Sequence, residues 1–434
     1  MTSRVLCARC LVKMDTHQGY SNLVLDAALK ESKLEGRDKA YASRLFYGVL
    51  ERRITLDACI APLCTTKLKK LAAPVRAVLE MAVYELLYTQ TPASAAVNCA
   101  VDTVRTLGQP KAAGLVNGVL RSFLRTECKI PVPSSPQSAR LSVENSVAEP
   151  LARLLVKSYG TAAAEKFLQS CHGAAPVFLR ANPTRTTPEK LVELLAAEGV
   201  SAQQTAIPGC LVLCGGTGGD LRRLSAFEQG LFHVQDAASQ LCVLSLDPQP
   251  GMSVLDICAA PGGKTFTAAG LMENKGRIAA LDLHPQRAKL IADGAGRLGF
   301  DCVAADSGDA TVFNPRLGSF DRILCDVPCS GIGVLRRKPE IRYKDPADFA
   351  DLPAIQHKIL ETAAGYAAPG ARLVYSTCTL NPAENQQVVE GFLADHPQWQ
   401  PAVLPDLLGG GWQTTLMNTE WNCDGFFISV LEKK

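Results

Sequence analysis

The segment Val254-Leu-Asp-Ile-Cys-Ala-Ala-Pro-Gly-Gly-Lys264 decides the fold of the C-terminal part of this chain. Its first four residues form a short apolar run, typical of a buried strand. The loop from Cys258 to Lys264 is made of small residues and glycine, and a helix is expected to begin at Thr265. Such a loop lets the backbone approach a ligand, and a helix N-terminus offers free N–H groups to an anion. Taken alone, the loop fits a nucleotide, a dinucleotide or an adenosyl ligand, but it lacks the GxGxxG and GxxxxGK[ST] spacings of NAD and ATP sites.

Short apolar runs alternate with helical segments from this point to the C-terminus. The runs are 254–257, 278–282, 302–306, 322–326, 373–377 and 426–431. This alternation predicts a doubly wound, mostly parallel sheet. Because ligands bind beyond the carboxyl ends of the strands in such a sheet, the residues at these ends are the candidates for function.

Acidic residues stand at three successive strand ends. Asp282 follows Cys258 by 24 residues and can take two ribose hydroxyls, the third run ends near Asp306 with Asp309 close by, and the fourth ends in Asp326. Burying several carboxylates side by side requires a ligand or partners to offset their repulsion. We therefore expect Asp282, Asp326 and one acid of the third run, either Asp306 or Asp309, to face a ligand.

Two cysteines follow the ends of the fourth and fifth predicted strands. They occur in Asp326-Val-Pro-Cys329-Ser-Gly and in Ser376-Thr-Cys378-Thr. A buried cysteine is ordinarily a small apolar side chain. A pair facing one crevice beside a carboxylate and a basic run indicates a nucleophile instead.

These three motifs, in this order, resemble the S-adenosylmethionine-dependent RNA (cytosine-5) methyltransferases of the Sun family. The resemblance extends to Val234-Gln-Asp-Ala-Ala-Ser-Gln240, which is similar to the lead-in to that fold. Near the N-terminus, residues 38–50 and 114–121 resemble the NusB-like RNA-binding domain. This combination is similar to the bacterial 16S rRNA enzymes of the Sun/Fmu type, and it covers essentially the whole chain. Thr379 stands where the family more often has serine.

The resemblance implies a role for each catalytic residue. Cys378 would add to C6 of cytosine, because breaking aromaticity makes C5 nucleophilic. Asp326 would act at the N3 edge of the base, where charge builds up. Cys329 would serve the release step after methyl transfer. One thiol would need activation by nearby positive charge, for which Lys264 and the run from Arg336 to Lys338 are candidates.

The resemblance also implies S-adenosyl-L-methionine as the cofactor. Asp282 would hold the ribose hydroxyls, Asp306 would lie near the adenine, and Asp326 would border the same site. The loop around the methionine part would consist of Cys258, Ala259, Ala260, Pro261, Gly262, Gly263 and Lys264. The target base must be unpaired or flipped out to reach this crevice.

The charge distribution suggests where RNA would bind. Residues 1–130 contain 19 Lys and Arg against 11 Asp and Glu, a balance of +8, whereas the whole chain has a net charge of only +3. A basic domain suits a phosphate backbone. Within the catalytic part, the run after Cys329 is expected to follow the RNA path, and Arg180 is expected to help from the middle domain. The basic residues of that run are Arg336, Arg337, Lys338, Arg342 and Lys344.

The chain divides into domains by its helical and strand periodicity. Apolar residues recur at helical spacing up to about residue 128, and the Pro/Ser stretch from Ile130 cannot continue a helix. The predicted fold is an all-α NusB-like N-terminal domain, a small α+β, RRM-like RNA-binding middle domain, and an α/β Rossmann-like SAM-dependent methyltransferase domain. The predicted boundaries are 1–128, a linker at 129–145, 146–235 and 236–434.

Composition narrows the class of protein further. With 434 residues, 47% hydrophobic and 20% charged, the chain can bury a sizeable core. Charged residues interrupt its longest apolar stretch, Leu71 to Tyr88, and no signal layout opens the chain. We therefore expect a soluble, cytoplasmic monomer with no membrane contact.

The 16 cysteines are scattered, which indicates reduced thiols. Cys7 and Cys10 form the single CxxC pair, so we expect ordinary positions on a first helix and no metal site. Two alternatives stay open: the same reaction on tRNA, and a non-catalytic RNA-binding or assembly factor. Residues 381–385 are expected to shape the turn after Cys378 and cap the next helix.

Overall fold

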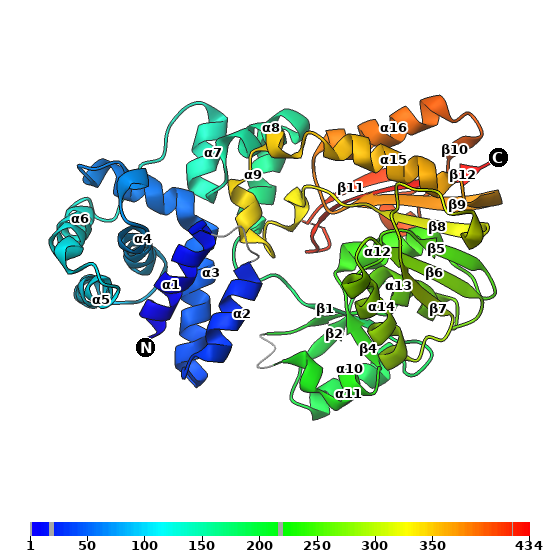
Figure 1. Cartoon of the computed structure of the whole chain (residues 1–434), viewed down its shortest axis with the longest axis horizontal. Coiled ribbons are helices and arrows are strands. Elements are labelled where there is room, and N and C mark those ends of the chain that lie inside the picture. The colour runs from blue at the N-terminus through cyan, green and yellow to red at the C-terminus, as the bar shows by residue number, and fades with distance from the viewer. Residues whose placement is uncertain (1, 17–20, 216–219, 419) are drawn as a thin grey trace. The chain divides into compact units, whose positions relative to one another are not determined.

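The computed structural model describes residues 2–16, 21–215, 220–418 and 420–434 (Figure 1). The chain forms two compact units. The first, which we call the helical unit, comprises Met1–Ala174 and Leu335–Asp348. The second, the sheet unit, comprises Ala175–Val334 and Phe349–Lys434. The chain thus leaves the sheet unit shortly after Cys329, contributes 335–348 to the helical unit, and returns.

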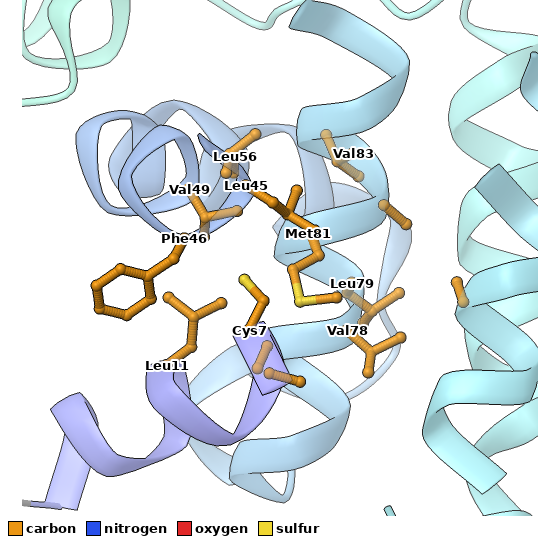
Figure 2. Packing of buried hydrophobic residues seen from close by; sticks show 14 of the residues in the cluster. Cys7, Leu11, Leu45, Phe46, Val49, Leu56, Val78, Leu79, Met81 and Val83 are labelled. Atoms are coloured by element: carbon orange, nitrogen blue, oxygen red, sulfur yellow. The ribbon is translucent and has the colours of Figure 1, made fainter. Parts of the chain in front are cut away.

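The helical unit is built from α-helices, and those between Ser3 and Arg125 share one apolar core, as the periodicity predicts. Its α-helices are α1 (Ser3–Thr16), α2 (Ser21–Glu31), α3 (Gly36–Ile60), α4 (Ala73–Tyr88), α5 (Ala93–Thr106), α6 (Ala113–Arg125), α7 (Gln137–Asn145), α8 (Glu149–Tyr159) and α9 (Thr161–Ser170). Figure 2 shows Cys7 and Leu11 of α1 packed beside Phe46 and Val49 of α3 and Met81 of α4. Cys7 and Cys10 are buried positions of this core.

The charged residues within the apolar stretch of α4 are paired inside this unit. Glu80 accepts from Arg53 at 3.0 Å and forms an ion pair with Arg76 at 2.8 Å, and Glu85 accepts from Arg4 at 2.6 Å. Burial raises the pKa of Glu80 to about 7. Among the described residues, no helix is both long enough and apolar enough to cross a membrane.

The segment expected to be a linker, 129–145, is irregular only in its first part. Helix α7 occupies its second part and follows Pro136, which takes the N-cap position. Proline prevents the preceding helix from continuing, but it is compatible with the start of the next one. Leu141 on α7 is fully buried, so this half of the segment belongs to a packed structure.

A small antiparallel sheet opens the sheet unit. Its strands are β1 (Phe178–Ala181), β2 (Ala202–Gln204), β3 (Cys210–Leu213) and β4 (Phe232–Val234), in the order β2-β3-β1-β4. Helices α10 (Pro188–Ala197) and α11 (Ser225–Glu228) accompany it. Thr187 caps α10 by accepting from the backbone of Lys190, and Pro188 occupies the first turn, which fixes the predicted start of this helix.

Among the described residues the large sheet has eight strands, and the five consecutive strands that run to one of its edges are parallel. The strand order is β10-β12-β9-β8-β5-β6-β7, with β11 paired to β12. The parallel strands are β5 (Ser253–Asp256), β6 (Arg277–Asp282), β7 (Val303–Ser307), β8 (Phe320–Asp326) and β9 (Ala367–Thr377). The antiparallel strands are β10 (Trp399–Pro401), β11 (Gln413–Met417) and β12 (Gly425–Lys433).

Helices cover both faces of this sheet, which confirms the predicted doubly wound class (Figure 1). One face packs against α12 (Ala237–Leu246), α13 (Gly263–Leu271) and α14 (Pro285–Leu298), and the other against α15 (Leu352–Ala364) and α16 (Gln386–Asp395). The chain proceeds from β5 to β6 on one side and reaches β8 on the other. This reversal of strand order places a crevice at the carboxyl ends of β5 and β8.

Candidate active site

A pocket of about 190 Å³ lies at the reversal of strand order. It combines the end of β5, the Gly-rich loop, the start of α12 and the last residue of β8. The lining residues are Val234, Gln235, Asp236, Ser239, Asp256, Cys258, Ala259, Ala260, Pro261, Gly263, Lys264 and Asp326. Most of the predicted methionine loop is therefore brought together around one cavity.

The Gly-rich loop is held by its backbone geometry and by Asp282. Gly262 has a φ of +105°, and a Cβ there would overlap the Phe266 ring, so this position requires glycine. Asp282 ends β6 and accepts from the Ala260 N–H at 3.3 Å, while Arg287 lies 3.1 Å from the same carboxylate oxygen. The carboxylate thus lies beside the loop, and a ribose contact by Asp282 stays a prediction.

Asp256 is a pocket residue that sequence reasoning missed. It ends β5 with 1% exposure, and one oxygen accepts from the Thr265 hydroxyl at 2.6 Å. The other, Oδ1, is buried and accepts no hydrogen bond from the described residues. Burial raises the pKa of Asp256 to about 7. The signal was available, because Asp256 is an acid at a strand end just like Asp282.

Lys264 and Asp326 form an ion pair across the pocket. Lys264 Nζ lies 2.7 Å from Asp326 Oδ2 and 3.2 Å from Ser239 Oγ, and Ser376 Oγ donates to Asp326 Oδ1 at 2.8 Å. Burial acts to lower the pKa of Lys264, but the Asp326 carboxylate outweighs it, and the net shift is upward. Lys264 therefore stays cationic next to the end of β9.

The two candidate cysteines lie together at the ends of neighbouring parallel strands. Cys329 follows β8, Cys378 follows β9, and their sulfur atoms are 3.3 Å apart. The hydrogen bond with Cys378, together with burial, raises the pKa of Cys329 well above its ordinary value. Lys264 interacts electrostatically with Cys378, and activation of a thiol by this cation stays a prediction.

The acids of the third strand do not share this buried environment. Asp306 is exposed, and one of its oxygens accepts from the next backbone N–H at 2.7 Å; Asp309 is exposed too and caps the turn at Thr311. Strand β7 is the edge of the sheet, so its end is flanked on one side only. The expectation of three buried strand-end carboxylates is therefore wrong for the third strand, and an adenine contact by Asp306 stays a prediction.

The basic residues proposed for RNA fall into two environments. Arg337, Lys338 and Lys344 are exposed, and Arg336 is partly buried. The prediction that Arg342 contacts RNA at the surface is wrong. Its side chain is 0% exposed, and its guanidinium donates to the carbonyls of Asn145 and Cys171 in the helical unit.

Arg180 is also enclosed. It is 5% exposed and donates to the Pro208 carbonyl, and burial lowers its pKa. Contact between Arg180 and RNA gains no support from this arrangement, because the guanidinium is directed at protein backbone.

The residues after Cys378 shape the turn as expected. Asn381 caps the short helix that follows by accepting from the Ala383 N–H, and Asn385 holds Thr377 and Thr379. Glu384 does more than the sequence indicated, since its carboxylate reaches Ser330 beside Cys329. Gln235, Asp236 and Ser239 also line the pocket, although the sequence singled them out only as a lead-in.

Comparison with known proteins assigns the class to which this fold and site belong. Residues 243–432 match the profile described as 16S rRNA methyltransferase RsmB/F, residues 1–125 match the NusB family, and residues 150–217 match the ferredoxin-like domain of RsmF/B-like methyltransferases. The sheet unit therefore carries a methyltransferase fold, joined to a NusB-type helical domain.

Full-length relatives give the family. The probable ribosomal RNA small subunit methyltransferase B of Bacillus subtilis is 35% identical, with 99% of this chain and 98% of the relative covered. A Synechocystis protein of the same description is 34% identical over 100% of both chains. The solved structure of PH0851 covers 100% of this chain and 99% of its own, with a TM-score of 0.83 and 24% identity, which shows the shared fold. The chain belongs to the RsmB/F family of 16S rRNA methyltransferases, in agreement with the resemblance drawn from its motifs.

Proposed function

We propose that this protein transfers a methyl group from S-adenosyl-L-methionine to C5 of a cytosine in 16S rRNA, through a transient bond between Cys378 and C6 of the base. The single observation that carries the proposal is the pair of sulfur atoms 3.3 Å apart at the ends of β8 and β9. Cys329 follows β8, whose last residue Asp326 lines the pocket and pairs with Lys264, and Cys378 follows β9, whose Ser376 donates to Asp326.

The pocket residues fit the methionine part of the cofactor. Asp256 Oδ1 is a buried acceptor in need of a donor, and an α-ammonium group offers three. The N-terminus of α13 presents backbone N–H groups that suit an α-carboxylate. The volume of about 190 Å³ is smaller than that of a whole-ligand pocket, so we assign the ribose to the adjoining Asp282. When bound, the cofactor supplies an electrophilic methyl group.

The protein's own residues would then act in sequence on the cytosine. The Cys378 thiolate forms a bond to C6, and the electron pair of the C5–C6 double bond moves into the ring. Asp326 acts at the N3 edge of the base, and the cationic Lys264, 2.7 Å from Asp326, stabilises the negative charge that builds up there. The enamine-like C5 can then accept the methyl group.

Release requires loss of the C5 proton, and the raised pKa of Cys329 suggests how its timing is set. While Cys378 is a thiolate, Cys329 keeps its proton and donates a hydrogen bond to it. Once Cys378 is bonded to carbon, that negative charge is gone, and Cys329 can release its own proton to solvent and become a thiolate. Cys329 then takes the C5 proton, the C5–C6 double bond re-forms, and the Cys378 sulfur leaves with its electron pair.

Two substitutions test the chemistry. Cys378→Ala is expected to lower transfer of tritiated methyl to RNA by about 1,000-fold or more, because no other thiol replaces the attacking sulfur. Cys329→Ala is expected to accumulate a covalent RNA adduct, visible as a slow band on a denaturing gel. Full methyl transfer by Cys378→Ala would show that the nucleophile is assigned wrongly.

The target RNA is tested separately. Bisulfite sequencing of total RNA from cells with and without the gene is expected to show one cytosine in 16S rRNA that loses protection when the gene is absent. Loss of protection in tRNA instead would move the same chemistry to another substrate. Unchanged RNA of every class would favour a non-catalytic assembly role.

A further inference from the structure

Glu384 is a fully buried carboxylate that joins the two loops carrying the cysteines. It lies after Cys378 along the chain, is 0% exposed, and accepts from the Ser330 N–H at 2.8 Å and the Ser330 hydroxyl at 2.6 Å. Asn381 and Gln356 donate to it at 3.0 and 3.1 Å. All four donors are neutral groups.

The same network fixes the chain on both sides of Cys329. Gln356 Nε2, which donates to Glu384, also donates to the Pro328 carbonyl at 2.9 Å. Ser330 is held by Glu384 and lies 2.7 Å from the Thr379 hydroxyl, next to Cys378. Ser330 is thus bound to the Glu384 carboxylate directly, and Pro328 is linked to it through Gln356.

Backbone carbonyls of Glu384 and Cys378 accept two further hydrogen bonds that hold the segment after β9. The Tyr375 hydroxyl donates to the Glu384 carbonyl at 2.6 Å, and the Gly333 N–H donates to the Cys378 carbonyl at 2.9 Å. Burying a carboxylate among neutral donors costs more than an apolar side chain of similar size would. Stability alone therefore gives little reason for a glutamate at this position. Its hydrogen bonds instead fix the geometry between the two loops.

We infer that Glu384 is a positioning residue that holds the Cys329 loop against the Cys378 loop and so sets the sulfur-to-sulfur distance on which release of the methylated RNA depends. It predicts that loss of the Glu384 hydrogen bonds slows release of the methylated RNA, which uses Cys329, more than methyl transfer, which uses Cys378 alone. The expected effect on release of the methylated RNA rests on the proposed function.

The first test measures the geometry without any RNA. Diamide, which oxidises two adjacent thiols to a disulfide, is expected to cross-link Cys329 to Cys378 in the full-length protein, with the product mapped by mass spectrometry. Glu384→Asp keeps the charge but is one methylene too short to reach Ser330, and we expect cross-linking to slow by about 10-fold. Glu390→Gln changes an exposed glutamate of α16 and should cross-link at the wild-type rate.

The second test separates the two chemical steps. In Glu384→Asp and Glu384→Gln, the single-turnover rate of methyl transfer is expected to stay within about 3-fold of wild type, while kcat falls by about 10-fold or more and covalent RNA adduct accumulates. A general loss of structure would lower both rates together. Equal decreases in both rates, or an unchanged cross-linking rate, would overturn the inference.

A milder variant covers the case in which the Glu384 variants do not fold. Ser330→Ala removes the hydrogen bonds of the hydroxyl to Glu384 and Thr379 but keeps the backbone N–H, so it should show the same pattern with a smaller amplitude. The two proposals also fail separately. If Cys329→Ala traps no adduct, the release role is wrong, and the cross-linking result still decides whether Glu384 sets the geometry.

Discussion

At the scale of single residues, burial gives identical carboxyl groups different roles. Asp256 is fully enclosed and has one oxygen without a hydrogen bond, Asp326 is paired with Lys264, and Asp306 faces solvent. All three stand at the ends of neighbouring or nearby strands. Their chemistry differs because the neighbours of each strand end differ, which is a property of the sheet and not of the residue type.

The enclosure of Asp256 predicts a pH dependence of stability. The native carboxyl keeps its proton up to about pH 7, whereas the unfolded chain releases it near its ordinary pKa of 3.8. The native state therefore binds more protons between these values, and the free energy of unfolding falls as pH rises from about 4 to 7 and levels off above. Asp256→Asn should remove this slope and raise the free energy of unfolding at pH 8 by an amount on the order of 4 kcal/mol.

Urea denaturation of the cofactor-free protein at pH 5.5 and pH 8 measures this difference. Asp301→Asn, at an exposed aspartate beside β7, is the matched control and should leave the slope unchanged. An Asp256→Asn variant with the wild-type slope would show that Asp256 does not carry the effect.

At the scale of elements, the loop after β8 is held in place by close backbone packing. Its short helical turn, Ile332–Val334, is buried, and a Cβ on Gly333 would overlap the carbonyl oxygen of Gly425 and lie 2.8 Å from that of Cys378. The loop thus lies between the start of β12 and the end of β9. Strand β12 therefore contributes to the site, although it carries none of the proposed catalytic groups.

Gly333→Ala tests this packing. Because the neighbouring atoms are backbone and cannot rotate away, we expect a loss of about 2–3 kcal/mol in the free energy of unfolding, together with reduced turnover. Gly391→Ala on α16 has open space around it and should be neutral or stabilising by up to about 1 kcal/mol. Chemical denaturation of both variants checks the contrast. Equal stability of the two would mean that the loop yields more easily than its packing implies.

At the scale of the whole molecule, the chain passes from the helical unit to the sheet unit, returns to the helical unit for residues 335–348, and ends in the sheet unit. Residues 335–348 follow the Cys329 loop and belong to the helical unit, where Arg342 is enclosed and the Tyr343 hydroxyl contacts the Leu50 carbonyl. The exposed Arg337 and Lys338 lie just before this anchor. We therefore interpret Arg337 and Lys338 as the exposed part of the basic run, with Arg342 as its anchor within the helical unit.

The excess positive charge of the helical unit predicts an electrostatic share in RNA binding. Lys69 and Lys70 are exposed, so the double change Lys69→Glu and Lys70→Glu should weaken RNA binding by about 10-fold at 0.1 M salt. The slope of affinity against salt concentration should fall by about 1 for each phosphate group that the variant no longer binds. Affinity for the cofactor should not change.

Filter binding over a range of salt concentrations measures the affinity for RNA, and equilibrium dialysis measures the affinity for the cofactor. The double change Lys190→Glu and Lys275→Glu, at exposed lysines of the sheet unit, controls for net charge. An equal loss of RNA affinity in both double variants would mean that total charge matters and the helical unit has no special share.

The sequence determined the parts of this protein that depend on local pattern. The alternation of apolar runs fixed the parallel strands β5, β6, β7, β8 and β9, because period and length distinguish strands from helices. The same runs located the Gly-rich loop, Asp282, Asp326, Cys329 and Cys378 at strand ends, since parallel strands all end at one edge.

Tertiary structure alone decided what surrounds those residues. The position of β7 at the sheet edge exposed Asp306, and the inclusion of 335–348 in the helical unit enclosed Arg342. Contacts between positions far apart in the chain, such as Ser330 with Glu384 and Lys264 with Asp326, leave no periodic trace in the sequence. Burial and hydrogen bonding set the charge and position of each group, and both depend on neighbours that only the folded chain brings together.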